Sequence, residues 1–222
     1  MNPKINSPSL TRIGEKKLLN TEGGKENYKV ILLGDAGVGK TSIFKRMTKG
    51  IYEGNYPITV GEEFAEILYQ YDNKGIIVNL WDTAGDERFR SLTKLTFMGT
   101  HCAILTYDIT VAKTFESMQY WVEEIKNNLS IQPIFVMVGN KVDESARAVH
   151  SDLAKNFANN CSIDLFYEVS AKTGNGIEEL FNSLILNLVK KFPSSTSIFP
   201  QQNNFNILTN PPINKDKKKG CC

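Results

Sequence analysis

Residues 34–41 read GDAGVGKT, and this stretch decides the fold because it follows a buried strand and opens a helix. The preceding residues, YKVILLG at 28–34, form an apolar run typical of a buried parallel strand. The helical pattern after Lys40 stops at Gly50, a suitable residue for ending a helix. A turn of this kind lets backbone N–H groups converge on phosphate oxygens at the positive end of a helix.

The motif G-x-x-x-x-G-K-[ST] assigns particular roles within this predicted phosphate cradle. Lys40 can reach the β and γ phosphates, and the Thr41 hydroxyl can ligate Mg²⁺. The alternative is a glycine-rich turn that binds nothing, but the complete motif between strand and helix favours the phosphate site. The cradle residues are Gly34, Asp35, Ala36, Gly37, Val38, Gly39, Lys40, Thr41 and Ser42.

Composition places the chain among ordinary globular proteins. It has 222 residues, 41% of them hydrophobic and 23% charged, and a net charge of +2, which gives no argument for nucleic-acid binding. The four cysteines show no spacing typical of disulfides or zinc, and Cys102 in an apolar run is expected to be buried. The first residues lack the apolar core of a secretory signal, Asn2 excludes N-myristoylation, and no run is long enough to span a membrane. We therefore expect a cytosolic location.

The chain divides into three predicted parts. Residues 1–27 are polar and aperiodic and predict a flexible N-terminal arm, whereas 192–222 are rich in Pro, Asn and Ser and predict a disordered tail. Between them, residues 28–191 alternate strands and helices, which predicts an α/β fold with a six-stranded, mostly parallel sheet and helices on both faces. Further strands are expected at 63–71, 75–83, 102–108, 134–140 and 165–170, and helices near 88–97, 114–128, 151–160 and 177–188. Asn175 is the expected N-cap of the last helix.

A second phosphate-sensing turn is expected in WDTAGDERF, residues 81–89. Asp82 ends a strand where it could orient a Mg²⁺-bound water, and the N–H of Gly85 could meet a γ-phosphate. Alone, D-x-x-G is a weak pattern, but it gains force after a phosphate cradle. Asp86 then raises a question, because it places an anion beside a presumed phosphate.

Two further motifs at strand ends predict selection of guanine. Asn140-Lys141-Val142-Asp143 offers a carboxylate that can accept hydrogen bonds from N1–H and the exocyclic amine of guanine, whereas adenine presents an acceptor at N1. Ser170-Ala171-Lys172 could turn a backbone N–H toward guanine O6. Alone, N-K-x-D can be a surface turn; together with the cradle, the two motifs favour a guanine nucleotide.

The chain resembles a Ras-superfamily small GTPase over roughly residues 28–191, on the basis of GDAGVGKT, WDTAG, NKVD and SAK. The finer pattern resembles the Rab branch of that superfamily, through WDTAG-x-ERF, YDIT at 107–110 and the terminal Cys-Cys. The resemblance implies that the P-loop NTPase G domain binds GTP or GDP with Mg²⁺. It makes Thr59 a Mg²⁺ ligand that senses the γ-phosphate, with Thr41 and Asp82 completing the metal site, and places Tyr52 over the guanine face. It implies switch segments near 52–63 and 84–98 that order with GTP and relax after hydrolysis.

Three positions depart from the pattern of these relatives. The resemblance implies catalytic roles for Lys40, Thr59 and residue 86. At residue 86, relatives carry the Gln that orients the attacking water, whereas Asp86 lacks that amide. Ala36 stands where relatives commonly carry Gly or Ser. Phe64 and Trp81 match two aromatics of the Rab effector surface, although core packing is an alternative for both, and Thr96 replaces the usual third aromatic.

The C-terminus predicts a lipid anchor. Four lysines, at 215 and 217–219, precede Cys221 and Cys222, and within a Rab-like chain this pattern indicates double geranylgeranylation supported by basic charge. The alternative is a solvated charge run with two ordinary thiols. Family analogy further implies an exchange factor, a GTPase-activating protein, a GDP-dissociation inhibitor and effectors, around a monomer at the cytoplasmic face of intracellular membranes.

The sequence leaves three functional hypotheses open. The first is a hydrolytic switch of vesicle-mediated traffic that hydrolyses GTP slowly alone. The second is a largely GTP-locked, membrane-bound effector platform, motivated by Asp86 and Ala36. The third is an ATP-using P-loop enzyme, which requires Asp143 to be misread.

Overall fold

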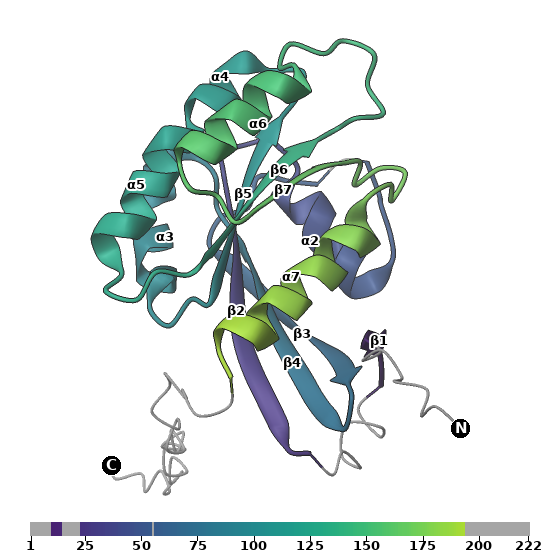
Figure 1. The fold of residues 1–222 in the computed structure, drawn as a ribbon. Helices are drawn as coiled ribbons and strands as arrows, with labels where there is room; N and C mark the ends of the chain where they lie inside the picture. Colours follow the sequence, from purple (N-terminus) through teal and green to yellow (C-terminus); the bar gives the residue numbers. More distant parts are fainter. Residues whose placement is uncertain (1–9, 15–22, 55, 194–222) are drawn as a thin grey trace, which may run out of the picture.

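The computed structural model describes residues 10–14, 23–54 and 56–193. The predicted arm segments 1–9 and 15–22, and the tail from 194 to 222 with its cysteines, lie outside the described residues. A seven-stranded sheet in the order β1-β3-β4-β2-β5-β6-β7 runs through the described part of the chain (Figure 1). Its strands are β1 (Leu10–Arg12), β2 (Lys25–Leu33), β3 (Glu62–Tyr71), β4 (Lys74–Thr83), β5 (Cys102–Asp108), β6 (Ile134–Asn140) and β7 (Leu165–Val169).

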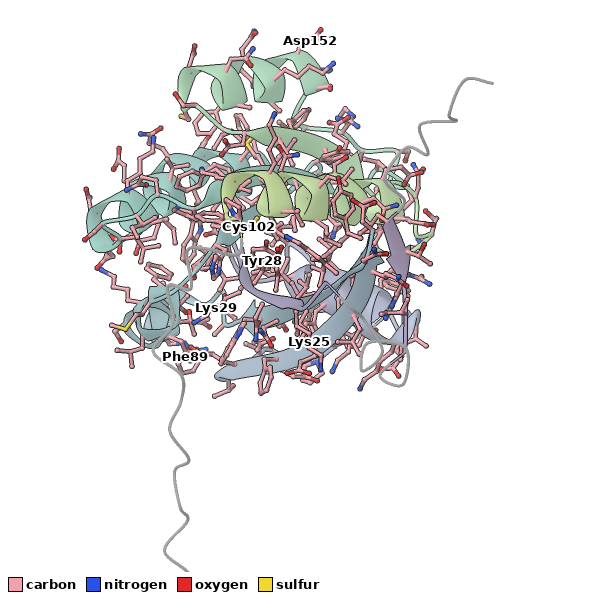
Figure 2. All side chains as sticks on the ribbon, turned by 60° about the horizontal axis from the view of Figure 1, so that its bottom comes forward. Lys25, Tyr28, Lys29, Phe89, Cys102 and Asp152 are labelled. Carbon is pink, nitrogen blue, oxygen red and sulfur yellow. The ribbon has the colours of Figure 1, made fainter. Side chains whose placement is uncertain are left out.

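Helices cover both faces of this sheet, and the alternation of strand residues shows why. In β2, Val30 and Leu32 join a core with α2 and α7, whereas Ile31 and Leu33 join a second core with α5 and α6. Tyr28 and Cys102 lie in the first core beneath α7 in Figure 2, while Asp152 points outward from α6. The helices are α2 (Lys40–Lys49), α3 (Arg90–Thr93), α4 (Ala112–Glu116), α5 (Met118–Asn128), α6 (Ser151–Asn160) and α7 (Ile177–Lys191), with 3₁₀ turns η1 (Glu87–Phe89) and η2 (Lys94–Phe97).

The strand directions gather the motifs at one edge of the sheet. β4, β2, β5, β6 and β7 pair in parallel, and β3 pairs with β4 in antiparallel fashion. The cradle follows β2, Asp82 lies near the end of β4, and Asn140 ends β6. The carboxyl ends of parallel strands are where α/β proteins bind ligands, so the predicted α/β class and location agree with the structure.

The prediction of six strands was one strand short, and the arm is not irregular throughout. β1 pairs antiparallel with the outer edge of β3, and Leu10 packs against the first core. β2 also begins at Lys25, inside the predicted arm. A three-residue strand is too short to show a period, and its pairing depends on an edge elsewhere in the chain.

Three helix predictions also need correction. The segment 88–97 is divided into η1, α3 and η2, and the hydroxyls of Thr93 and Thr96 bond to backbone carbonyls within it, which competes with regular helix. The segment 114–128 is divided at Ser117, whose hydroxyl donates to Asp35 at 2.6 Å. The last helix is capped by Gly176 with a φ of 74°, not by Asn175.

Candidate functional site

A cavity of about 300 Å³ lies at the carboxyl edge of the sheet and joins most of the predicted site residues. The cradle, the segment before β3, the turn after β4 and both base-reading motifs contribute to its walls. Residues lining it include Ala36, Gly37, Gly39, Lys40, Thr41, Ser42, Tyr52, Thr59, Gly85, Asn140, Lys141, Asp143, Ala171 and Lys172. Residues far apart in the sequence therefore converge as the motifs predict.

Lys40 lines the end of the cavity where the phosphate cradle was predicted. Its Nζ donates to the carbonyls of Gly34 and Asp35, both at 2.9 Å. Burial lowers the pKa of Lys40 to about 8, while the carboxylates of Asp82 and Asp35 oppose that shift. A cation held this far from water gains strongly from a phosphate partner.

Two glycines are required by close approach at this end. A Cβ on Gly85 would lie 2.2 Å from Lys40 Nζ and 2.6 Å from the Asp35 carbonyl, so the turn after β4 rests directly on the cradle. A Cβ on Gly39, whose φ is 98°, would lie 2.3 Å from Asn140 Nδ2. The cradle is thus packed against the predicted γ-phosphate turn at Gly85 and against Asn140 of the predicted base-reading motif.

The three predicted metal-site residues meet beside Lys40. Thr41 Oγ1 donates to Asp82 Oδ2 at 2.6 Å and lies 2.9 Å from Thr59 Oγ1. Burial raises the pKa of Asp82, while the Thr41 hydrogen bond and Lys40 lower it. Within the described part of the chain, Asp82 Oδ1 is buried without a hydrogen-bond partner. Hydroxyl and carboxylate oxygens are ligands that Mg²⁺ prefers, so this donor set fits that ion.

At the other end of the cavity, side chains connect the two base-reading motifs. Asn140 Nδ2 donates to the Val38 carbonyl at 2.9 Å, and its Oδ1 accepts from the Ala171 N–H at 3.1 Å. Ser170 Oγ donates to Asp143 Oδ1 at 2.5 Å. Of the predicted donors to guanine O6, the Ala171 N–H is therefore engaged by Asn140 here.

Asp143 is kept ionised by its hydrogen-bond partners. Desolvation tends to raise the pKa of Asp143, but hydrogen bonds from Ser170 and Lys172 lower it below its usual range. Lys141 bridges the carboxylate of Asp108 and the carbonyl of Gly37, at 2.5 and 2.8 Å. An ionised Asp143 facing the cavity is the acceptor that guanine requires.

Asp86 forms its contacts with its own turn. Its Oδ1 accepts from the backbone N–H and Nε of Arg88, at 3.0 and 2.8 Å, and its Oδ2 accepts from Nη2 at 2.7 Å. Arg88 thereby lowers the pKa of Asp86 to about 2, with its side-chain hydrogen bonds as the largest cause. The carboxylate caps η1, which begins at the next residue, as Asp commonly does at helix starts. The anion beside the presumed phosphate is therefore matched by a cation two residues away.

The predicted effector residues form a stacked pair. The rings of Phe64 and Trp81 lie 5.1 Å apart at 21°, and Lys29 Nζ lies 4.7 Å from the Trp81 ring centre. Phe64 is 55% exposed, which argues against core packing for this residue, whereas Thr96 and Phe97 are buried. The third aromatic of the Rab effector surface therefore has no exposed counterpart at position 96 or 97. The role of the pair in effector binding stays a prediction.

Comparison with known proteins defines the class. A sequence model of the Ras family matches residues 29–190. The chain belongs to the Ras family, whose members are GTPases that hydrolyse GTP to GDP. Its relatives include Rab proteins: it is 31% identical to the Ras-related protein RABA1h of Arabidopsis thaliana, with 88% of this chain and 93% of the relative covered. It is 33% identical to Rab-7a of Dictyostelium discoideum (87% and 96% covered) and 35% identical to human Rab-30 (77% and 84% covered).

Sequence reasoning placed Asp35 in the cradle but missed its side-chain contacts, and it missed Arg46 entirely. Asp35 accepts hydrogen bonds from Ser117 and from Trp121 Nε1, the latter at 3.2 Å, so its carboxylate links the cradle to α5 and the residue before it. Arg46 donates to carbonyls of the second base-reading motif. Both contacts join segments distant in sequence, so no short sequence motif predicts them.

Among the described residues, no helix has the length and apolar character needed to cross a bilayer.

Proposed function

We propose that this GTPase is a Mg²⁺-dependent GTP/GDP switch of vesicle-mediated membrane traffic. The observation that carries the nucleotide assignment is that Lys40 and Asp143 line one and the same cavity. Thr41 and Thr59 would hold Mg²⁺ directly and Asp82 would hold it through a water, and the ion would neutralise charge at the β and γ phosphates. Tyr52, Gly85, Lys141 and the 170–172 motif complete the proposed nucleotide contacts.

Switching follows from the position of Thr59 and Gly85. Residues 51–54 and 56–61 form no helix or strand. Within this segment, Thr59 Oγ1 lies within hydrogen-bonding distance of Thr41 Oγ1. A γ-phosphate with its Mg²⁺ would attract Thr59 and the Gly85 N–H, and its loss would release them. Effectors would then read this segment together with Phe64 and Trp81.

Membrane attachment and partners are proposed from the family. Cys221 and Cys222 would carry geranylgeranyl groups, with the lysines before them adding attraction to an anionic leaflet. An exchange factor, a GTPase-activating protein and a GDP-dissociation inhibitor would act on a monomer that cycles between cytosol and membrane.

A largely GTP-locked platform is the second candidate, favoured by the Asp86–Arg88 pair. Two measurements distinguish the candidate functions: the identity of the nucleotide bound to the purified protein, and the rate of single-turnover hydrolysis with a Rab-type GTPase-activating protein. We expect mainly GDP and accelerated hydrolysis. Bound GTP with no acceleration would instead support the locked platform, and displacement of the bound nucleotide by ATP as readily as by GTP would contradict both.

A further inference from the structure

Arg46 joins the phosphate-binding helix to the base-reading loop. Its Nε donates to the Ala171 carbonyl at 2.9 Å and its Nη2 to the Lys172 carbonyl at 2.6 Å. Its Nη1 donates to Gly50 at 3.0 Å, just beyond the end of α2. The planar fork of arginine suits several fixed acceptors at once, which a lysine ammonium on a flexible stem does not.

The loop is held from both sides at Ala171. Asn140 accepts from its N–H, and Arg46 donates to its carbonyl. The next carbonyl, of Lys172, is also held by Arg46. The peptide units that would meet guanine are therefore positioned between the strand that carries Asn140 and the helix that begins at Lys40.

We propose that Arg46 is a positioning residue for guanine recognition, acting through the carbonyls of Ala171 and Lys172. The proposal rests on the proposed guanine-nucleotide function and names a residue outside its motifs. Since Arg46 and Lys40 share one short helix, the base loop and the phosphate cradle are set in a fixed relation. Loss of the fork should let the base loop move while the cradle stays in place.

The competing explanation is that Arg46 only stabilises the end of α2. It lies in the last turn of that helix, where a cation complements the helix dipole. Arg12 provides a matched control, because its Nη2 donates to the Thr48 carbonyl at 3.1 Å, at the same helix end, and both arginines line one cavity of about 450 Å³. Of the contacts described, those to the base loop belong to Arg46.

The test compares the full chain with Arg46→Met, Arg46→Lys and Arg12→Met. Release of ribose-labelled GDP should be about tenfold faster in Arg46→Met, since two charge-assisted hydrogen bonds to the loop are lost. Arg46→Lys should lie between it and the wild type, and Arg12→Met should stay within about twofold. Competition by pyrophosphate with Mg²⁺, which has no base, should be unchanged in all variants.

The outcomes separate the alternatives. Equal weakening of GDP and pyrophosphate binding, or equal effects of Arg12→Met and Arg46→Met, would overturn the positioning role. If Arg46→Met does not fold, the same comparison in Arg46→Lys decides, and unchanged GDP release there would count against the proposal. A wild type that retains labelled ADP as well as labelled GDP would instead contradict the guanine-nucleotide function itself.

Discussion

The two ends of the proposed nucleotide cavity are built differently. At the base end, Asn140, Asp143 and the 170–172 loop are tied together by side chains from several elements. At the phosphate end, Asp82 keeps one buried oxygen without a partner within the described chain, and Asp86 is held by its own turn. The base end is thus preorganised for discrimination, whereas the phosphate end has capacity that a charged ligand and a cation would fill.

The largest expected effect comes from reversing the hydrogen-bonding character of the base end. In Asp143→Asn, an amide donor would meet the donors of guanine, while the carbonyl at C2 of xanthine would find a partner. We expect affinity for GTP to fall at least about 100-fold and affinity for xanthosine triphosphate to rise, measured by competition with labelled nucleotide. Glu144→Gln, which changes a neighbouring acid in the cavity wall, is the control. Unchanged GTP affinity would show that Asp143 does not read the base.

A smaller effect is expected at the phosphate end, at residue 86. Asp86→Gln should hydrolyse GTP about tenfold faster in a single-turnover assay, because an amide that can orient water replaces a carboxylate held by Arg88. The same change removes the short acceptor that caps η1, so hydrogen exchange at Arg88 N–H should also become faster.

Asp86→Asn is the matched variant for this prediction. It keeps a short oxygen that can accept from the Arg88 N–H but removes the charge. We expect little acceleration of hydrolysis from it. Equal rates for the wild type and Asp86→Gln would place residue 86 outside the catalytic position, and an equally fast Asp86→Asn would assign the effect to charge alone.

The sequence predicted much of the fold and most of the cavity, for a physical reason. Phosphate cradles and base-reading turns depend on local backbone geometry and on a few side chains, so short motifs such as GDAGVGKT and NKVD carry them. The alternation of apolar runs likewise predicted the strands from 28 to 169. Comparison with known families then established the class.

What the sequence did not predict depends on distant partners. β1 exists because the edge of β3 is available to it, and the role of Arg46 depends on carbonyls more than a hundred residues away. The capping role of Asp86 is different because its partner, Arg88, lies only two residues away, and Asp before a short helical turn is a common start signal. The sequence pattern at Asp86 is therefore compatible with a structural role as well as with the position of the catalytic Gln.

The smallest expected effect concerns the charge of Lys40. Burial lowers its pKa to about 8 in the nucleotide-free protein, and a bound phosphate would raise it again. Phosphate binding therefore depends on the protonated form of Lys40. That form is almost fully populated below about pH 7 and is lost as the pH rises through 8. Affinity for GDP should fall about fourfold between pH 7 and pH 8.5, because only the protonated lysine pairs with phosphate.

Lys40→Arg isolates this titration, since a guanidinium stays charged throughout that range. Its binding profile should be flat with pH, whatever its absolute affinity. The carboxylates of Asp82 and Asp35 raise the pKa of Lys40. In an Asp82→Asn background that pKa should fall further, so affinity for GDP should decrease more steeply with pH. A wild-type profile that is flat to pH 8.5 would mean that Lys40 is already fully compensated without ligand, and the contrast between the two ends of the cavity would then rest on Asp82 alone.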